Sequence, residues 1–127
     1  VAGDGARVQD NVESWLRADA ARAFASIADE KAGILGTAYR RIVVRDPRTR
    51  GGWCSRSGDL AFSWRLVMAP KDVLEYVVAH EVAHLKVMNH SRRFWAVVDR
   101  ICDDVDRSRD WLRVHGAALH RYGPPPG

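Results

Sequence analysis

Residues 72–91 read DVLEYVVAHEVAHLKVMNHS, and this stretch decides the fold. Its first half is apolar on nearly every side and contains no proline or glycine, so it predicts a buried central helix from Asp72 to about Met88. Pro70 suits the first turn of that helix. Residues 89–91, Asn-His-Ser, end it, and Ser91 is placed to cap a second helix that follows.

The predicted central helix contains His80-Glu81-Val82-Ala83-His84, which matches the pattern H-E-x-x-H. Residues four apart on a helix share one face and lie about 6 Å apart along the axis, so two imidazoles can bind one metal ion. Glu81 lies about 100° further round, where it can reach a water beside the metal. Buried core histidines held by hydrogen bonds are the alternative, but three titratable groups in an apolar helix are costly to bury without a partner. The pattern therefore predicts a zinc site and a general base, Glu81, of a hydrolase, with a peptidase as the favoured kind.

The third ligand is open to more than one residue. His90 follows His80 by ten positions, just beyond the predicted helix end, and is the first choice. The metzincin pattern has the same offset, but Val87 stands where that pattern has glycine, so the turn must be made differently. Asp99 and Asp103 on the following helix are the alternatives. Weaker candidates lie near the expected cleft as possible oxyanion donors: Tyr76, His115, His120 and Tyr122.

The rest of the chain predicts an α+β fold around this helix. Apolar residues at three- and four-residue steps predict an N-terminal amphipathic helix over 6–31, closed by Gly33. Three short segments, Arg41–Arg45, Trp53–Ser55 and Asp59–Met68, predict a small antiparallel sheet. Helices after Ser91 and near Asp110 complete a minimal zincin-like fold.

Composition limits the organisation of the chain. With 127 residues and 46% apolar content, the chain predicts one domain over 1–127, with a proline-rich tail at 123–127 expected to be disordered. No membrane span or signal peptide is visible, which favours the cytoplasm. Cys54 and Cys102 are too few and too far apart for a disulfide framework or a thiolate zinc site, so we expect free, mostly buried thiols.

Positive charge gathers in one part of the sequence. Residues 40–65 contain seven arginines against two aspartates, a net charge of +5, while the chain as a whole carries +4. Such a patch could bind an acidic polymer, but charged residues also protect exposed sheet edges from aggregation, and we favour that interpretation. A weak association with nucleic acid is therefore a secondary expectation.

Several motifs together resemble the YgjP-like metallopeptidases, relatives of the SprT and WLM zinc proteases. The resemblance covers about residues 35–115 and rests on Arg45-Asp46, Trp53-Cys54-Ser55, Ser63-Trp64-Arg65-Leu66, Ala69-Pro70, the run from Tyr76 to Leu85, Asn89-His90-Ser91, Phe94-Trp95 and Trp111-Leu112. It implies that His80, His84 and His90 bind Zn²⁺ and that Glu81 is catalytic, with a protein or peptide as substrate. The competing hypothesis is a zinc-binding module with little or no turnover.

Overall fold

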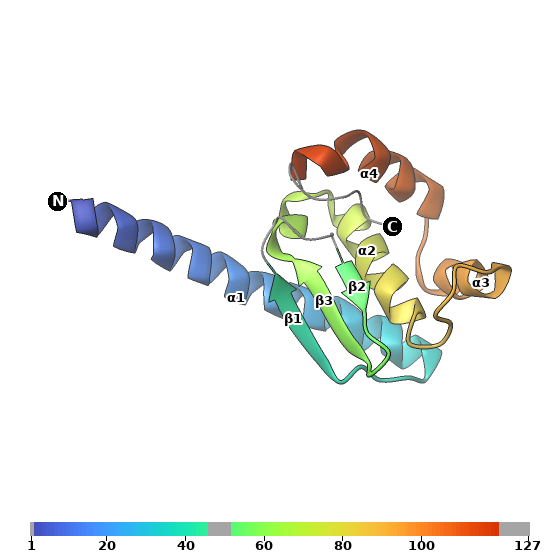
Figure 1. The fold of residues 1–127 in the computed structure, drawn as a ribbon. Helices are drawn as coiled ribbons and strands as arrows, with labels where there is room; N and C mark the ends of the chain where they lie inside the picture. The colour runs from blue at the N-terminus through green and yellow to red at the C-terminus, as the bar shows by residue number, and fades with distance from the viewer. Residues whose placement is uncertain (1, 46–51, 120–127) are drawn as a thin grey trace.

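The computed structural model describes residues 2–45 and 52–119 (Figure 1). In chain order its elements are α1 (Ala2–Leu35), β1 (Arg41–Arg45), β2 (Gly52–Cys54), β3 (Asp59–Ser63), the 3₁₀ helix η1 (Trp64–Met68), α2 (Lys71–Ala83), α3 (Arg92–Ile101) and α4 (Val105–Leu119). The predicted α+β class is confirmed. The tail at 123–127, His120 and Tyr122 lie outside the described residues.

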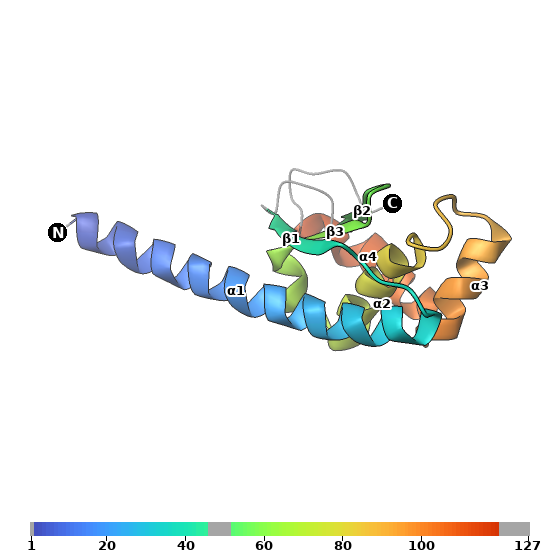
Figure 2. The same ribbon diagram turned by 90° about the horizontal axis from the view of Figure 1, so that it is seen from below.

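Helix α1 is longer than predicted, and only its C-terminal part packs on the domain. Its buried side chains recur every three or four residues, among them Ala20, Phe24 and Ala28. The N-terminal part projects away from the other elements (Figures 1 and 2), and Trp15 is 61% exposed. Gly33 does not end the helix, because the left-handed residue that a helix C-terminus needs is Gly36, with φ +66°.

The sheet is mixed, not antiparallel throughout as predicted. Its strand order is β1-β3-β2, with β1 parallel to β3 and β2 antiparallel to β3. β3 takes the central place and is the most buried of the three strands, with Leu60 and Phe62 fully buried. Phe24 of α1 packs against Phe62 with ring centroids 4.8 Å apart. Helices α1 and α2 pack on the sheet, and Figure 2 shows α1 below the strands.

The strand predicted over Asp59–Met68 ends at Ser63. The Ser63 hydroxyl accepts a hydrogen bond from the Arg65 backbone N–H at 3.3 Å, which caps η1. A serine that caps a helix offers the backbone an alternative to the strand ladder. The alternating pattern therefore continues into a helical turn, and Pro70 then leads into α2.

Helix α2 lies at the centre of the fold, and its residues from Tyr76 to Ala83 are all buried. The Ser91 hydroxyl caps α3 as predicted, accepting from the Phe94 N–H at 3.4 Å. Helix α4 begins at Val105, five residues earlier than expected. The apolar pattern does not predict its first turn, because a buried position there is occupied by a polar residue, Ser108. The Ser108 hydroxyl is fully buried and donates a hydrogen bond to the Asp72 carbonyl oxygen.

Both cysteines are free, as predicted, with Cys54 half-buried and Cys102 buried. Burial raises the pKa of each thiol to about 11. Within the described ranges, no helix combines the length and the apolar character needed to cross a bilayer.

Candidate metal centre

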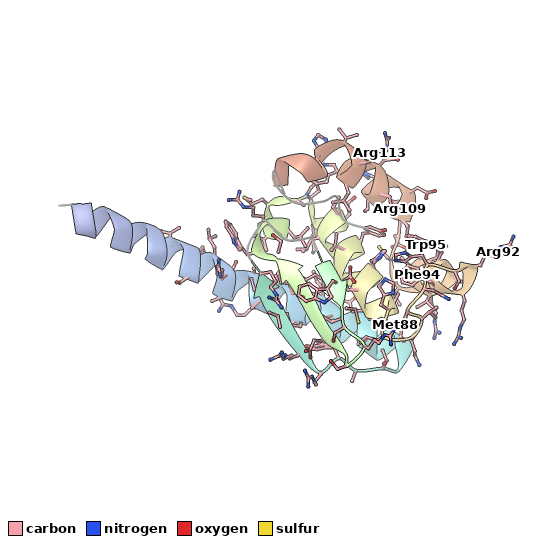
Figure 3. The ribbon with its side chains drawn as sticks, in the orientation of Figure 1. Met88, Arg92, Phe94, Trp95, Arg109 and Arg113 are labelled. Atoms are coloured by element: carbon pink, nitrogen blue, oxygen red, sulfur yellow. The ribbon has the colours of Figure 1, made fainter. Side chains whose placement is uncertain are left out.

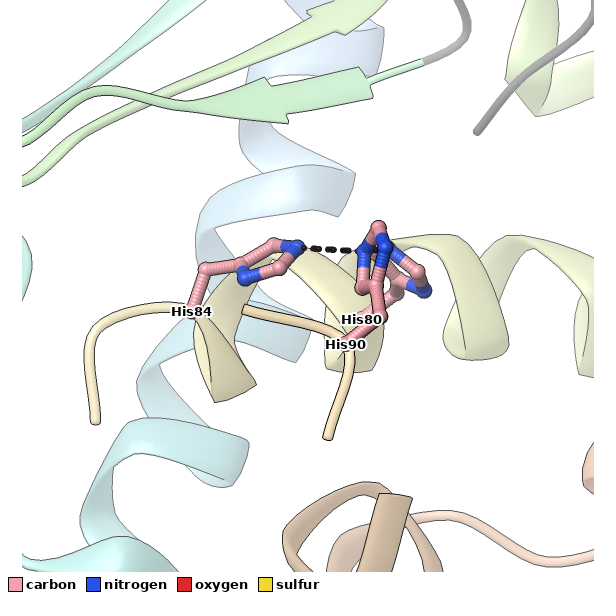
Figure 4. Close-up of side chains that lie close together, drawn as sticks. All are labelled: His80, His84 and His90. Carbon is pink, nitrogen blue, oxygen red and sulfur yellow. Dashed lines mark hydrogen bonds between the residues drawn. The ribbon is translucent and has the colours of Figure 1, made fainter. Parts of the chain in front are cut away.

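Three imidazoles converge where α2 meets the segment before α3 (Figure 4). His80 and His84 come from α2 and its C-cap, and His90 comes from the segment that leads into α3. The Nε2 atom of His90 lies 3.1 Å from Nε2 of His84 and 3.2 Å from Nε2 of His80. Among the described residues, this is the group of three or more histidine, cysteine or acidic side chains close enough to hold one metal ion.

The turn that returns His90 to the helix begins at His84. Helix α2 ends at Ala83 rather than near Met88, because the last backbone bonds tighten to 3₁₀ type, including His84 N–H to Glu81 O and Leu85 N–H to Val82 O. Glycine is therefore not required at position 87. The backbone carbonyl of Val87 instead accepts a hydrogen bond from Nδ1 of His84 at 3.0 Å.

The hydrogen bonds determine which nitrogen of each imidazole faces the centre. A carbonyl oxygen can only accept, so Nδ1 of His84 carries the proton and Nε2 presents its lone pair. Nδ1 of His80 lies 3.3 Å from the Tyr76 hydroxyl, which can accept its proton in the same way. Metal-binding histidines usually donate their second ring N–H to such a partner.

Burial favours the neutral form of the His80 and His84 imidazoles. His80 is 4% exposed, and desolvation, followed by the nearby charges of His84, His90 and Arg109, lowers its pKa to about 3. Desolvation also lowers the pKa of His84. A neutral imidazole is the form that binds a metal ion.

The spacing of the three Nε2 atoms fits a single ion better than a hydrogen-bonded cluster. One proton on Nε2 of His90 can be directed at only one neighbour, which would leave two lone pairs facing each other. Nitrogen ligands at about 2.0–2.1 Å from a tetrahedral zinc ion lie about 3.3–3.4 Å apart. The observed separations of 3.1 and 3.2 Å are close to that value. The donor set of three imidazole nitrogens therefore fits zinc.

Aromatic side chains of α3 surround the imidazoles. Phe94 stacks on His84 with ring centroids 4.4 Å apart, and Trp95 lies 5.7 Å from His80 and 6.0 Å from His90. These rings exclude water from one side of the centre. Asp99 and Asp103, the alternative third ligands, are exposed and do not join the cluster.

Glu81 lies next to His80 in α2, and its side chain lies close to Gly52 of β2. It is 6% exposed, and a Cβ atom added at Gly52 would come 3.2 Å from its Cγ. The glycine therefore lets the edge strand approach the helix at the position of this carboxylate. No sequence argument identified Gly52, although a glycine within a strand indicates a close backbone approach.

The centre opens into a cleft of about 840 Å³. One wall is α2 with Gly52 of β2, and the opposite wall is α4. The α4 residues that line the cleft are Asp106, Arg109, Asp110, Leu112 and Arg113. Sequence reasoning missed these charged residues, although their spacing of three and four marks one face of a helix. His115, a weak candidate, instead packs on Trp111 at 4.7 Å.

Two comparisons with known proteins found a match. A family model described as YgjP-like, metallopeptidase domain, matches residues 1–115. A search of curated proteins gave no match. Among solved structures, the crystal structure of the metallopeptidase zymogen abylysin from Pyrococcus abyssi is similar, with a TM-score of 0.64 and 20% sequence identity over 80% of this chain and 99% of that chain. This likeness concerns the fold.

Proposed function

The chain belongs to the YgjP-like metallopeptidase family, and we propose that it is a zinc-dependent peptidase in which His80, His84 and His90 bind the ion and Glu81 is the general base. The family makes it a metal-dependent peptidase and hydrolase. The observation that carries the finer proposal is the convergence of three Nε2 atoms within bonding distance of one ion, beside a buried carboxylate.

Zinc held by three imidazoles lowers the pKa of a water molecule and polarises a carbonyl group. Glu81 takes a proton from the attacking water and passes it to the amine nitrogen as the C–N bond breaks, so that one water is consumed for each peptide bond. Tyr76 holds the His80 ring through its hydroxyl, and the Val87 carbonyl holds the His84 ring. Phe94 and Trp95 keep bulk water away from the imidazoles.

The sheet offers a place for an extended substrate. β2 is an edge strand that packs on α2 beside Glu81. Its outer backbone groups can pair with a peptide, which adds to the sheet as a further strand and lies along the cleft. This placement brings a substrate carbonyl into the cleft that His80, Glu81 and His90 line.

The arginine-rich segment gives less support to a nucleic-acid partner. Arg40 and Arg41 both donate to Asp59, and this pairing lowers the pKa of that carboxyl group to about 2. Arg45 lies over the Trp53 ring, 4.5 Å from its centroid. Arg48 and Arg50 lie outside the described residues. These arginines thus have partners within the sheet. This favours a role in the sheet and at its edge over binding of nucleic acid.

Replacement of the proposed base tests this function. A Glu81→Gln protein should keep its zinc but lose peptide hydrolysis by about 10²- to 10⁴-fold, because the amide cannot accept the proton. Metal analysis and a casein or mixed-peptide assay measure the two properties. Glu75→Gln, a change on the same helix away from the cleft, is the matched control and should leave both unchanged. Equal hydrolysis by the Glu81→Gln and wild-type proteins, or none by the wild type, would contradict the proposal.

A further inference from the structure

The wall of the cleft opposite the proposed base is a charged helix face. Asp106, Arg109, Asp110 and Arg113 follow each other at steps of three, one and three residues, so they lie on one side of α4 and all line the cleft. Val105 and Ser108 of the same helix are buried against the domain. The peptidase mechanism above uses none of these four side chains.

Arg109 differs from the other arginines of α4 in its partner. Arg113 lies 3.6 Å from Asp110, and Arg107 lies 3.6 Å from Asp72. The guanidinium of Arg109 instead lies over the Trp95 ring, 4.4 Å from its centroid, and no carboxylate of the described residues forms a salt bridge with it. A guanidinium that lies over an aromatic ring keeps N–H donors that the ring does not cover, and these can bind a carboxylate in the plane of the guanidinium.

The contact with Trp95 also limits the distance between the Arg109 guanidinium and the proposed metal ligand His80. The same Trp95 ring contacts His80 at 5.7 Å between centroids, so the Arg109 guanidinium lies within about 10 Å of that imidazole. An extended peptide advances about 3.3 Å per residue. A group that reaches Arg109 therefore belongs to a residue within about three positions of the bond to be cut.

We infer that Arg109, held on Trp95, selects peptides that carry a carboxylate within about three residues of the scissile bond. This inference rests on the proposed peptidase function. The carboxylate can be an aspartate or glutamate side chain or the C-terminal carboxylate of the peptide. Among the cleft-lining acids of α4, Asp110 is paired with Arg113, so Asp106 is the one that could instead favour a basic side chain.

The test measures peptide binding separately from turnover. Zinc-loaded Glu81→Gln protein is titrated calorimetrically with amidated hexapeptides that differ only in one residue, Glu, Gln or Lys, placed in turn at each central position. A second pair of neutral hexapeptides ends in a free carboxylate or an amide. We expect the best glutamate or free-carboxylate peptide to bind about tenfold more tightly than its neutral partner. A difference within the first set shows that Arg109 binds a glutamate side chain, and a difference within the second pair shows that it binds the C-terminal carboxylate.

Variants of Arg109 connect the preference to this side chain. In the Glu81→Gln protein, the further change Arg109→Gln should abolish the difference in affinity between carboxylate and neutral peptides. Arg109→Lys, which keeps the charge, should retain part of this difference. Arg92→Gln is the control, because Arg92 is an exposed arginine that points away from the cleft (Figure 3). A lysine preference, no preference, or a preference that survives Arg109→Gln would overturn the inference. If an Arg109-dependent preference is found but the wild type cleaves no peptide, the peptidase proposal fails and the assignment of Arg109 as a carboxylate-binding residue stands.

Discussion

The orientation of each imidazole depends on the group that its second ring nitrogen contacts. His84 is held by a backbone carbonyl, which no side-chain substitution removes, whereas His80 is held by the hydroxyl of Tyr76. Such outer contacts fix the tautomer and the direction of the ligand lone pair. The sequence offers Tyr76 as a weaker candidate for an oxyanion donor. It is 5% exposed, and its hydroxyl is engaged with His80, so we assign it a positioning role.

Tyr76→Phe tests that role at the residue scale. Loss of the hydroxyl should lower zinc affinity by about 10- to 100-fold, because His80 loses the acceptor that orients its ring. Competition with a fluorescent zinc chelator measures the affinity. Tyr39→Phe is the control, since the Tyr39 hydroxyl donates to Asp29 at 2.6 Å away from the centre. Equal zinc affinities for wild type and Tyr76→Phe would show that His80 needs no such partner.

The residues of the centre could be found from the sequence because their spacing has a local cause. His80, Glu81 and His84 are set by one turn of helix, and His90 by a short return from it. Arg109 could not be found in this way. Its place in the cleft depends on how α4 packs against α2 and on the contact with Trp95, and neither is encoded by nearby residues.

At the scale of elements, the approach of β2 to α2 determines the space around Glu81. A Cβ at Gly52 would lie 3.0 Å from Cδ1 of Phe62 and 3.2 Å from Val77 and Glu81 side-chain atoms. Contacts that short force neighbouring atoms to move. The strand, the helix and the carboxylate are therefore coupled at this one position.

Gly52→Ala should lower peptide hydrolysis by about tenfold or more while zinc content stays the same. The added methyl group displaces Glu81 or β2 by a few tenths of an ångström, and small displacements of a catalytic group are costly. Steady-state kinetics with parallel metal analysis measure the change. Gly33→Ala, which adds a methyl group in open space within α1, is the control. Unchanged kcat/KM in Gly52→Ala would contradict this coupling.

Element boundaries were less predictable than the elements themselves. The apolar pattern of Asp59–Met68 continues smoothly, but the Ser63 hydroxyl converts its second half into a 3₁₀ helix. The end of α1 depends on which glycine adopts a positive φ, and this glycine is Gly36 rather than the predicted Gly33. The strand order could not be predicted from local sequence patterns either, because β3 lies between two strands that precede it in the chain.

On the scale of the whole molecule, the fold brings two chain segments together at one centre. α1 and the sheet hold α2 in the interior, while α3 and α4 close the other side (Figure 1). The centre needs His80 and His84 from α2 and His90 from the segment before α3, so an ion bound there would tie these segments together. Ligands that bind only the folded chain also stabilise it.

Zinc content is the most direct test of the account. Inductively coupled plasma mass spectrometry of the purified protein should find about one zinc per chain, and the single changes His80→Ala, His84→Ala and His90→Ala should each remove most of it, since two remaining imidazoles form an incomplete site. His115→Ala, which alters an exposed histidine of α4, should retain the wild-type amount. A wild-type protein that binds no zinc, or one whose zinc content is unchanged by all three substitutions, would contradict the assignment of these imidazoles as a metal centre.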